Sequence, residues 1–138
     1  MQGNVLHILL VEDNAADVML VREALRSCSI PADVFIAYDG EQALKFLDEL
    51  ELKPEFVLLD LNLPKFNGYA VLEKYRERGG PPLVVFTSSE EKENKQRALA
   101  LGARDYVVKP RSFQEFIGTV QGIVERWASG GFSTAAQG

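Results

Sequence analysis

The chain has 138 residues, 46% of them hydrophobic and 25% charged, which predicts one globular domain rather than a disordered or membrane-spanning chain. Its net charge of -5 argues against a nucleic-acid-binding surface, because phosphate binding needs clustered Lys and Arg. No stretch is apolar for long enough to cross a bilayer, and the first four residues lack the features of a signal peptide, so we expect a cytoplasmic protein with no membrane partner.

Five short apolar runs predict buried β-strands. They cover residues 5–11, 34–37, 56–59, 83–86 and 106–108. The first, third and fourth runs are almost continuously apolar, which is typical of parallel strands covered on both faces. Because helical stretches separate the runs, the chain is predicted to repeat a strand-helix unit five times.

The first three predicted helices have recognisable start or stop signals. The first, about residues 15–27, follows Asp13 and Asn14, which are both candidates for its N-cap. The second opens after Asp39-Gly40. The third, about residues 69–78, is stopped by two glycines and two prolines.

The last two helices begin at capping-box patterns. The fourth is expected to start after Ser88 and to end at Gly102, and the fifth is expected to follow Ser112. One face of the fifth carries an apolar stripe: Phe113, Phe116, Ile117, Val120, Ile123, Val124 and Trp127. Gly118 and Gly122 lie on the opposite face, where they are either tolerated at an exposed site or allow a second subunit to approach closely.

Polar residues that can carry chemistry follow four of the predicted strands. Glu12 and Asp13 follow the first, Asp60 the third, Thr87 the fourth and Lys109 the fifth. If the strands are parallel, all these ends meet at one edge of the sheet, which is where open α/β sheets bind ligands. Alone, each residue has an ordinary role as a cap, a turn or a solvated loop residue; their joint occurrence favours a site.

The charges of this site need an additional cation. Two carboxylates about 4 Å apart repel by about 4 kcal/mol at an effective dielectric near 20, and the site contains Glu12, Asp13 and Asp60. Oxygen ligands of this kind suit Mg2+ better than zinc. Lys109 would supply a fixed cation and Thr87 a hydroxyl donor for oxygens that the metal does not reach. Together these groups describe a phosphoryl acceptor.

Over residues 6–127 the chain resembles the receiver domain of two-component response regulators. The resemblance rests on LLVEDN at 9–14, LLDLNLP at 58–64 with Gly68, VVFTS at 84–88 and YVVKP at 106–110. It implies a flavodoxin-like α/β fold, a (βα)5 three-layer sandwich with a parallel five-stranded sheet of order 2-1-3-4-5. We expect the receiver domain over residues 1–127 and a flexible tail over 128–138.

The resemblance implies a role for each acidic residue. Asp60 matches the aspartate that accepts a phosphoryl group from the phosphohistidine of a sensor histidine kinase in a phosphorelay. Glu12 and Asp13 match the acidic pair that holds Mg2+ directly or through water. Asn62 matches the position whose backbone carbonyl completes the metal site.

The resemblance also implies a switch. Thr87 and Lys109 match the hydroxyl and ammonium that contact the phosphoryl group, Pro110 would follow a cis peptide bond, and Tyr106 matches an aromatic whose rotamer reports activation. Phosphorylation would then alter the surface of the fourth helix, fifth strand and fifth helix. In the family this surface often forms a homodimer, near which Gly118 and Gly122 would lie.

Other motifs resemble a subclass, the single-domain regulators that partner phytochrome-type sensor kinases. These motifs are DLNLP, VEDNAADV and the C-terminal IVERW. Ser88 and Arg111 depart from the common family residues and bear on partner choice and phosphate lifetime. Because the chain ends eleven residues after Trp127, we expect its output to be a contact with a downstream protein or with itself rather than with nucleic acid.

Three alternatives remain at this stage. The chain could be a docking module that works without phosphorylation, a flavodoxin-type FMN carrier, or a phosphatase with an aspartate nucleophile. An FMN carrier would place phosphate at the turn after the first strand, where Glu12 and Asp13 would repel it. The phosphatase class has an acid two residues after its nucleophile, where this chain has Asn62. We therefore expect no enzyme activity beyond self-phosphorylation from small donors and autodephosphorylation.

Overall fold

Five strands and five helices alternate along the computed structural model, which describes residues 5–49, 53–63 and 67–128. The strands are β1 (Leu6–Val11), β2 (Ala32–Ala37), β3 (Phe56–Leu59), β4 (Leu83–Thr87) and β5 (Asp105–Val108). The helices are α1 (Ala15–Arg26), α2 (Gly40–Glu49), α3 (Gly68–Arg78), α4 (Lys92–Ala100) and α5 (Phe113–Ala128). The element order agrees with the prediction, and most bounds differ by only one or two residues.

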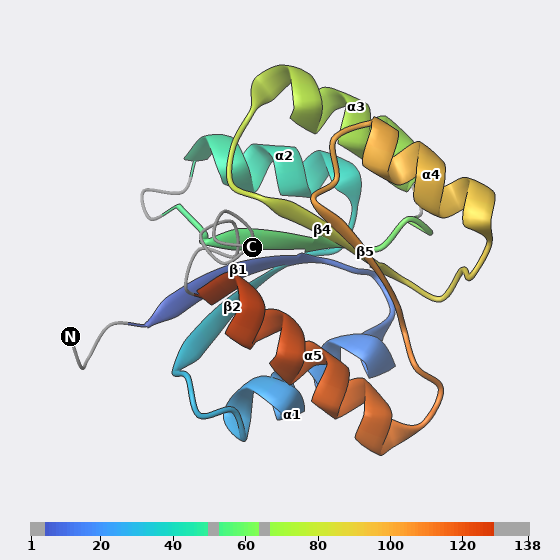
Figure 1. Cartoon of the computed structure of the whole chain (residues 1–138). Coiled ribbons are helices and arrows are strands. Elements are labelled where there is room, and N and C mark those ends of the chain that lie inside the picture. The colour runs from blue at the N-terminus through green and yellow to red at the C-terminus, as the bar shows by residue number, and fades with distance from the viewer. Residues whose placement is uncertain (1–4, 50–52, 64–66, 129–138) are drawn as a thin grey trace, which may run out of the picture.

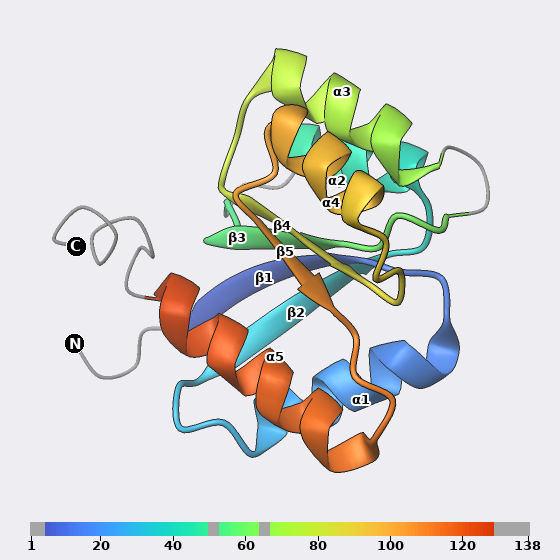
Figure 2. The same ribbon diagram turned by 45° about the vertical axis from the view of Figure 1, so that its right-hand side comes forward.

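The strands form one parallel sheet of order β2-β1-β3-β4-β5. Helices α1 and α5 cover one face of this sheet, and α2, α3 and α4 cover the other (Figures 1 and 2). The predicted flavodoxin-like (βα)5 sandwich is therefore confirmed. Because all five strands run in the same direction, their carboxyl ends lie along one edge of the sheet.

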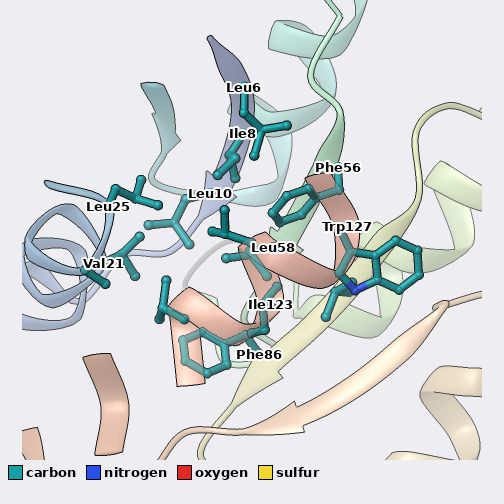
Figure 3. Close-up of a cluster of buried hydrophobic side chains, with 14 of the residues drawn as sticks. Leu6, Ile8, Leu10, Val21, Leu25, Phe56, Leu58, Phe86, Ile123 and Trp127 are labelled. Atoms are coloured by element: carbon teal, nitrogen blue, oxygen red, sulfur yellow. The ribbon is translucent and has the colours of Figure 1, made fainter. Parts of the chain in front are cut away.

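The sheet separates two hydrophobic cores, and alternate residues of each strand enter opposite ones. In β1, Ile8 and Leu10 belong to the core under α1 and α5, whereas Leu9 and Val11 belong to the core under α2, α3 and α4. Figure 3 shows the first core, in which Trp127 of α5 lies beside strand residues. Burial on both faces explains why the central strands are apolar runs without a polar alternation.

Side-chain caps hold three helices at their predicted starts. Asn14 accepts a hydrogen bond from the backbone N–H of Asp17 (2.9 Å), and Asn67 accepts one from Ala70 (3.0 Å). Ser112 accepts one from Glu115 (3.1 Å). These bonds satisfy backbone donors that have no partner within the helix. Of the two cap candidates for α1, the structure selects Asn14.

The predicted start of α4 was wrong. The helix begins at Lys92, and its N-cap residue Glu91 makes no side-chain capping bond. Instead of capping, the Ser89 hydroxyl accepts hydrogen bonds from the side-chain amide of Asn94 (2.7 Å) and the backbone N–H of Glu91 (3.4 Å). The Ser-Ser-Glu-Glu segment therefore forms a loop before α4, and the Ser89 hydroxyl accepts local hydrogen bonds within it instead of capping the helix.

The apolar stripe of α5 is buried except at Phe113, which is exposed, and at Ile117, which is partly buried. Phe113 is 58% exposed and lines a surface pocket together with Glu23 and Ser27 at the end of α1. Ala128 ends α5, and the remainder of the predicted tail, residues 129–138, lies outside the described residues. Among the described residues, no helix combines the length and apolar character that crossing a bilayer requires.

A methyl group added at two of the glycines is expected to have opposite effects on stability. A Cβ at Gly68 would collide with Cα of Leu61 and lie 3.0 Å from its carbonyl carbon, whereas a Cβ at Gly118 would meet nothing within 4 Å. We expect Gly68→Ala to destabilise the fold by about 1–3 kcal/mol through overpacking. Gly118→Ala should stabilise it by about 1 kcal/mol through helix propensity. Urea unfolding measures both, and equal shifts of the two midpoints would contradict the expectation.

Candidate functional site

The carboxyl edge of the sheet brings together the residues that were predicted to meet there. Thr87 ends β4, Asp60 follows β3, and Lys109 follows β5. The Thr87 hydroxyl donates to Oδ1 of Asp60 (2.9 Å), and the Lys109 ammonium lies 3.2 Å from Oδ2 of Asp60. Both carboxylate oxygens of Asp60 are thus hydrogen-bonded by residues far away in the sequence.

Asp60 is almost completely buried, and hydrogen bonds fix its position. Its residue is 6% exposed, and Thr87 beside it is fully buried. The backbone N–H of Asp60 donates to the carbonyl of Val11 (3.1 Å), and its Oδ1 accepts from the N–H of Asn62 (3.2 Å). Asn62 therefore lies next to Asp60 as expected, while the proposed role of its carbonyl oxygen as a metal ligand stays a prediction.

Lys109 contacts three carboxylates at once. Besides Asp60, its Nζ atom lies 2.7 Å from Oε1 of Glu12 and 2.7 Å from Oδ2 of Asp17. The lysine side chain is 8% exposed and that of Glu12 is 2% exposed, so these interactions are poorly screened by water. An ammonium has three protons to donate, and each of these carboxylates can accept one.

Asp17 is the site residue that the sequence analysis missed. It stands in the first turn of α1, where an acidic residue is ordinary because the helix dipole favours negative charge. A usable signal was its position four residues after Asp13, on the helix that begins at the site. That position does not identify its partner, because the pairing with Lys109 spans 92 positions of the chain.

Among the described residues of the site, negative charge exceeds positive charge. One carboxylate oxygen from each of Glu12, Asp13 and Asp60 lies within 4.8 Å of the others. Burial raises the pKa of Glu12 to about 7 against the opposing effect of Lys109, and Asp60 adds to the rise. Burial alone would lower the pKa of Lys109, but the neighbouring carboxylates outweigh it and hold that pKa above its ordinary value.

This donor set fits a hard divalent cation. It offers clustered carboxylate oxygens and no cysteine or histidine, which is the chemistry that Mg2+ prefers. Within the described ranges, Lys109 is the one ammonium paired with the buried Glu12, and Asp17 and Asp60 share it, so a further positive charge would offset the remaining repulsion. The predicted metal ligands Glu12 and Asp13 therefore lie in an acidic cluster with the chemistry to hold such an ion, and their role as ligands stays a prediction.

Tyr106 points inward from β5. It is 7% exposed, and its hydroxyl donates to the backbone carbonyl of Ser89 (2.9 Å). The ring thus lies beneath the loop that connects Thr87 with α4. Its position is compatible with the predicted switch role, which stays a prediction.

The predicted cis peptide before Pro110 was wrong. No cis bond occurs in the part of the chain that the structure describes, so the Lys109–Pro110 bond is trans. The trans form is the lower in energy for X–Pro bonds, by about 0.5–1 kcal/mol. With this bond trans, the backbone N–H of Lys109 donates to the carbonyl of Thr87 (2.7 Å), and the side chain reaches all three carboxylates.

The sequence that forms this site matches a known protein family. Residues 8–121 match the family model described as the response regulator receiver domain. The chain belongs to this family. The match covers β2 to β5, β1 from Ile8 onward and all the residues that meet at the carboxyl edge of the sheet, which makes the predicted resemblance a confirmed membership.

Individual receiver domains are similar over nearly their whole length. Response regulator Rcp1 of Synechocystis sp. is 36% identical over 128 residues, which are 87% of this chain and 87% of Rcp1. The phosphorylated cyanobacterial phytochrome response regulator RcpA superimposes with a TM-score of 0.83 at 32% identity, over 91% of this chain and 96% of RcpA. The Mn2+-bound form of Rcp1 gives a TM-score of 0.78 at 35% identity, over 88% of this chain and 93% of that one.

Proposed function

We propose that this receiver domain accepts a phosphoryl group on Asp60 from a sensor histidine kinase. The observation that carries the proposal is the buried Asp60 carboxylate, with both oxygens held by the Thr87 hydroxyl and the Lys109 ammonium. In the transfer, an Asp60 oxygen forms a new bond to phosphorus while the bond from phosphorus to the kinase histidine breaks. The imidazole leaves with the electron pair of that bond.

Lys109 and Thr87 would stabilise the transferred group. Both already contact Asp60, so little movement is needed for them to donate to phosphoryl oxygens at the same place. Charge-assisted bonds of this kind are about twice as strong as neutral ones. Asp17 in α1 would remain paired with Lys109 and so restrict the position of the ammonium.

Glu12, Asp13, Asp60 and the carbonyl of Asn62 are the residues that would hold Mg2+. The bound ion would neutralise charge on the phosphoryl oxygens and on the clustered carboxylates. The acidic cluster supports this assignment, and similarity to the Mn2+-bound form of Rcp1 supports binding of a divalent cation.

The proposals for the partner kinase and for the output rest on similarity to other response regulators. Since RcpA is described as a phytochrome response regulator, we propose a phytochrome-like sensor kinase, acting in the cytoplasm, as the phosphodonor. The output would be a changed surface of α4, β5 and α5, read by a downstream protein or by a second copy of the chain. Gly118 and Gly122 on α5 leave open space in which a second copy could approach.

The protein is proposed to be the substrate of its own reactions. Self-phosphorylation from small donors and autodephosphorylation would be its only reactions, with no turnover of an external substrate. A docking module without phosphorylation is disfavoured, since such a module has no need to bury Glu12 and Asp60 around Lys109 at a cost in desolvation.

Metal-dependent phosphorylation tests the proposal. Incubation with acetyl phosphate and Mg2+ should add the mass of one phosphoryl group to the intact protein, because Asp60 then meets an activated donor beside a neutralising cation. EDTA should suppress this gain at least tenfold, and Mn2+ should restore it. Equal labelling with Mg2+ and with EDTA would contradict the metal assignment, and no labelling under any condition would contradict phosphoryl acceptance.

A further inference from the structure

A chain of hydrogen bonds connects α3 to Tyr106 without passing through Asp60. The Tyr69 hydroxyl in the first turn of α3 donates to Oδ1 of Asn94 in α4 (2.6 Å). The side-chain amide of Asn94 donates to the Ser89 hydroxyl (2.7 Å), and the Ser89 carbonyl accepts from the Tyr106 hydroxyl (2.9 Å). Four residues from four different segments thus form one continuous network.

The first member of this network, Tyr69, packs against α4. The guanidinium of Arg97 lies 3.9 Å from the centre of the Tyr69 ring, which fixes the ring against α4. One residue earlier, the N–H of Gly68 donates to the carbonyl of Leu61 (2.8 Å), and the backbones are too close there for any side chain on Gly68. The start of α3 is therefore tied to the residue that follows Asp60.

The last member of the network depends on the loop between β4 and α4. This loop lacks a capping box, since the Ser89 hydroxyl is occupied by Asn94 and Glu91. Asn94 also donates to Oε1 of Glu91 (3.2 Å), which closes the loop against the first turn of α4. Asn94 therefore contacts Ser89, the residue whose carbonyl accepts from the Tyr106 hydroxyl.

We propose that Tyr69 is a positioning residue for Tyr106. Acting through Asn94 and Ser89, it holds the loop so that the Ser89 carbonyl is presented to the Tyr106 hydroxyl and keeps that ring inside. Tyr106 is then controlled from two directions, by Thr87 at the start of the loop and by Tyr69 from α3. This inference rests on the proposed function only in treating Tyr106 as the moving part of the switch.

The variant Tyr69→Phe distinguishes a positioning role of the Tyr69 hydroxyl from a packing role of its ring, because it removes one oxygen atom only. Tyr69→Phe keeps the ring and its contact with Arg97 but removes the donor to Asn94. The loss of one hydrogen bond in a network should shift the ratio of inward to outward Tyr106 by roughly fivefold toward outward. Asn94→Ala should shift it in the same direction, and the double variant should add little because both changes break the same route.

Fluorine NMR measures this ratio in the unphosphorylated protein. The chain has four tyrosines, so 3-fluorotyrosine gives four signals that single Tyr→Phe variants assign. The Tyr106 signal should gain solvent exposure, seen as a larger H2O/D2O isotope shift, in Tyr69→Phe and in Asn94→Ala. Tyr38→Phe is the matched control, because Tyr38 is 52% exposed and lies outside the network.

The outcomes separate this inference from the proposed function. An unchanged Tyr106 signal in both variants, with urea unfolding showing that they are folded, would overturn the positioning role. Since no phosphodonor is present, that result would leave phosphorylation of Asp60 untouched. Conversely, a failure of Asp60 to accept phosphate would not alter the Tyr106 signal in this measurement.

Discussion

Asp60→Asn is expected to abolish phosphorylation of this chain by acetyl phosphate and Mg2+. The reaction needs a carboxylate oxygen with a full share of negative charge, and a neutral amide oxygen at the same place is a far weaker nucleophile. Intact-protein mass spectrometry should therefore show the gain of one phosphoryl group in the wild type and none in the variant. The bond formed in the wild type should be cleaved by hydroxylamine, as an acyl phosphate is.

Asp60→Asn should remain folded, so that a loss of phosphorylation reflects the missing carboxylate and not unfolding. Lys109 keeps Glu12 and Asp17 as partners at 2.7 Å each after the change, and the amide occupies the same volume as the carboxylate. Asp33→Asn is a matched control, because Asp33 is an exposed residue of β2 away from the site. Labelling that persists in Asp60→Asn, or that resists hydroxylamine, would place the acceptor on another residue.

Lys109→Met is expected to lower the free energy of unfolding by about 3 kcal/mol in metal-free buffer. Removal of one partner from a buried ion pair leaves the other charges uncompensated, at a typical cost of 3–5 kcal/mol. The lower end applies here, because Glu12 already has a pKa of about 7 and can take up a proton instead of remaining charged. Methionine preserves most of the packing near Phe86, whose ring centre lies 5.9 Å from the ammonium.

Mg2+ should restore much of this stability. With the ammonium gone, Glu12 and Asp60 no longer have a competing partner, and an ion that binds only the folded state stabilises it by mass action. Urea unfolding with EDTA and with Mg2+ should therefore show a larger metal effect in Lys109→Met than in the wild type, while phosphorylation becomes slower. Lys45→Met, at an exposed position of α2, should change neither quantity. A metal effect no larger than that of the wild type would contradict the shared-carboxylate arrangement.

The fold could be predicted because its signals are local. Apolar runs of strand length, separated by capped helices, specify a sheet covered on both faces, and five such units have few arrangements that bury every run. The predicted start of α4 failed because several hydroxyl and amide groups near it could bond in more than one way. The Ser89 hydroxyl bonds Asn94 instead of capping the helix.

The site could be predicted in outline for a similar reason. Parallel strands deliver their carboxyl ends to one edge, so the sequence alone determined that Glu12, Asp13, Asp60, Thr87 and Lys109 would meet. Only the tertiary structure decided how their charges pair. Asp17 meets Lys109 across 92 positions, and Tyr69 meets Asn94 across 25. Such pairings depend on distances between side chains of separate elements, and periodicity and capping along the chain carry no information about those distances.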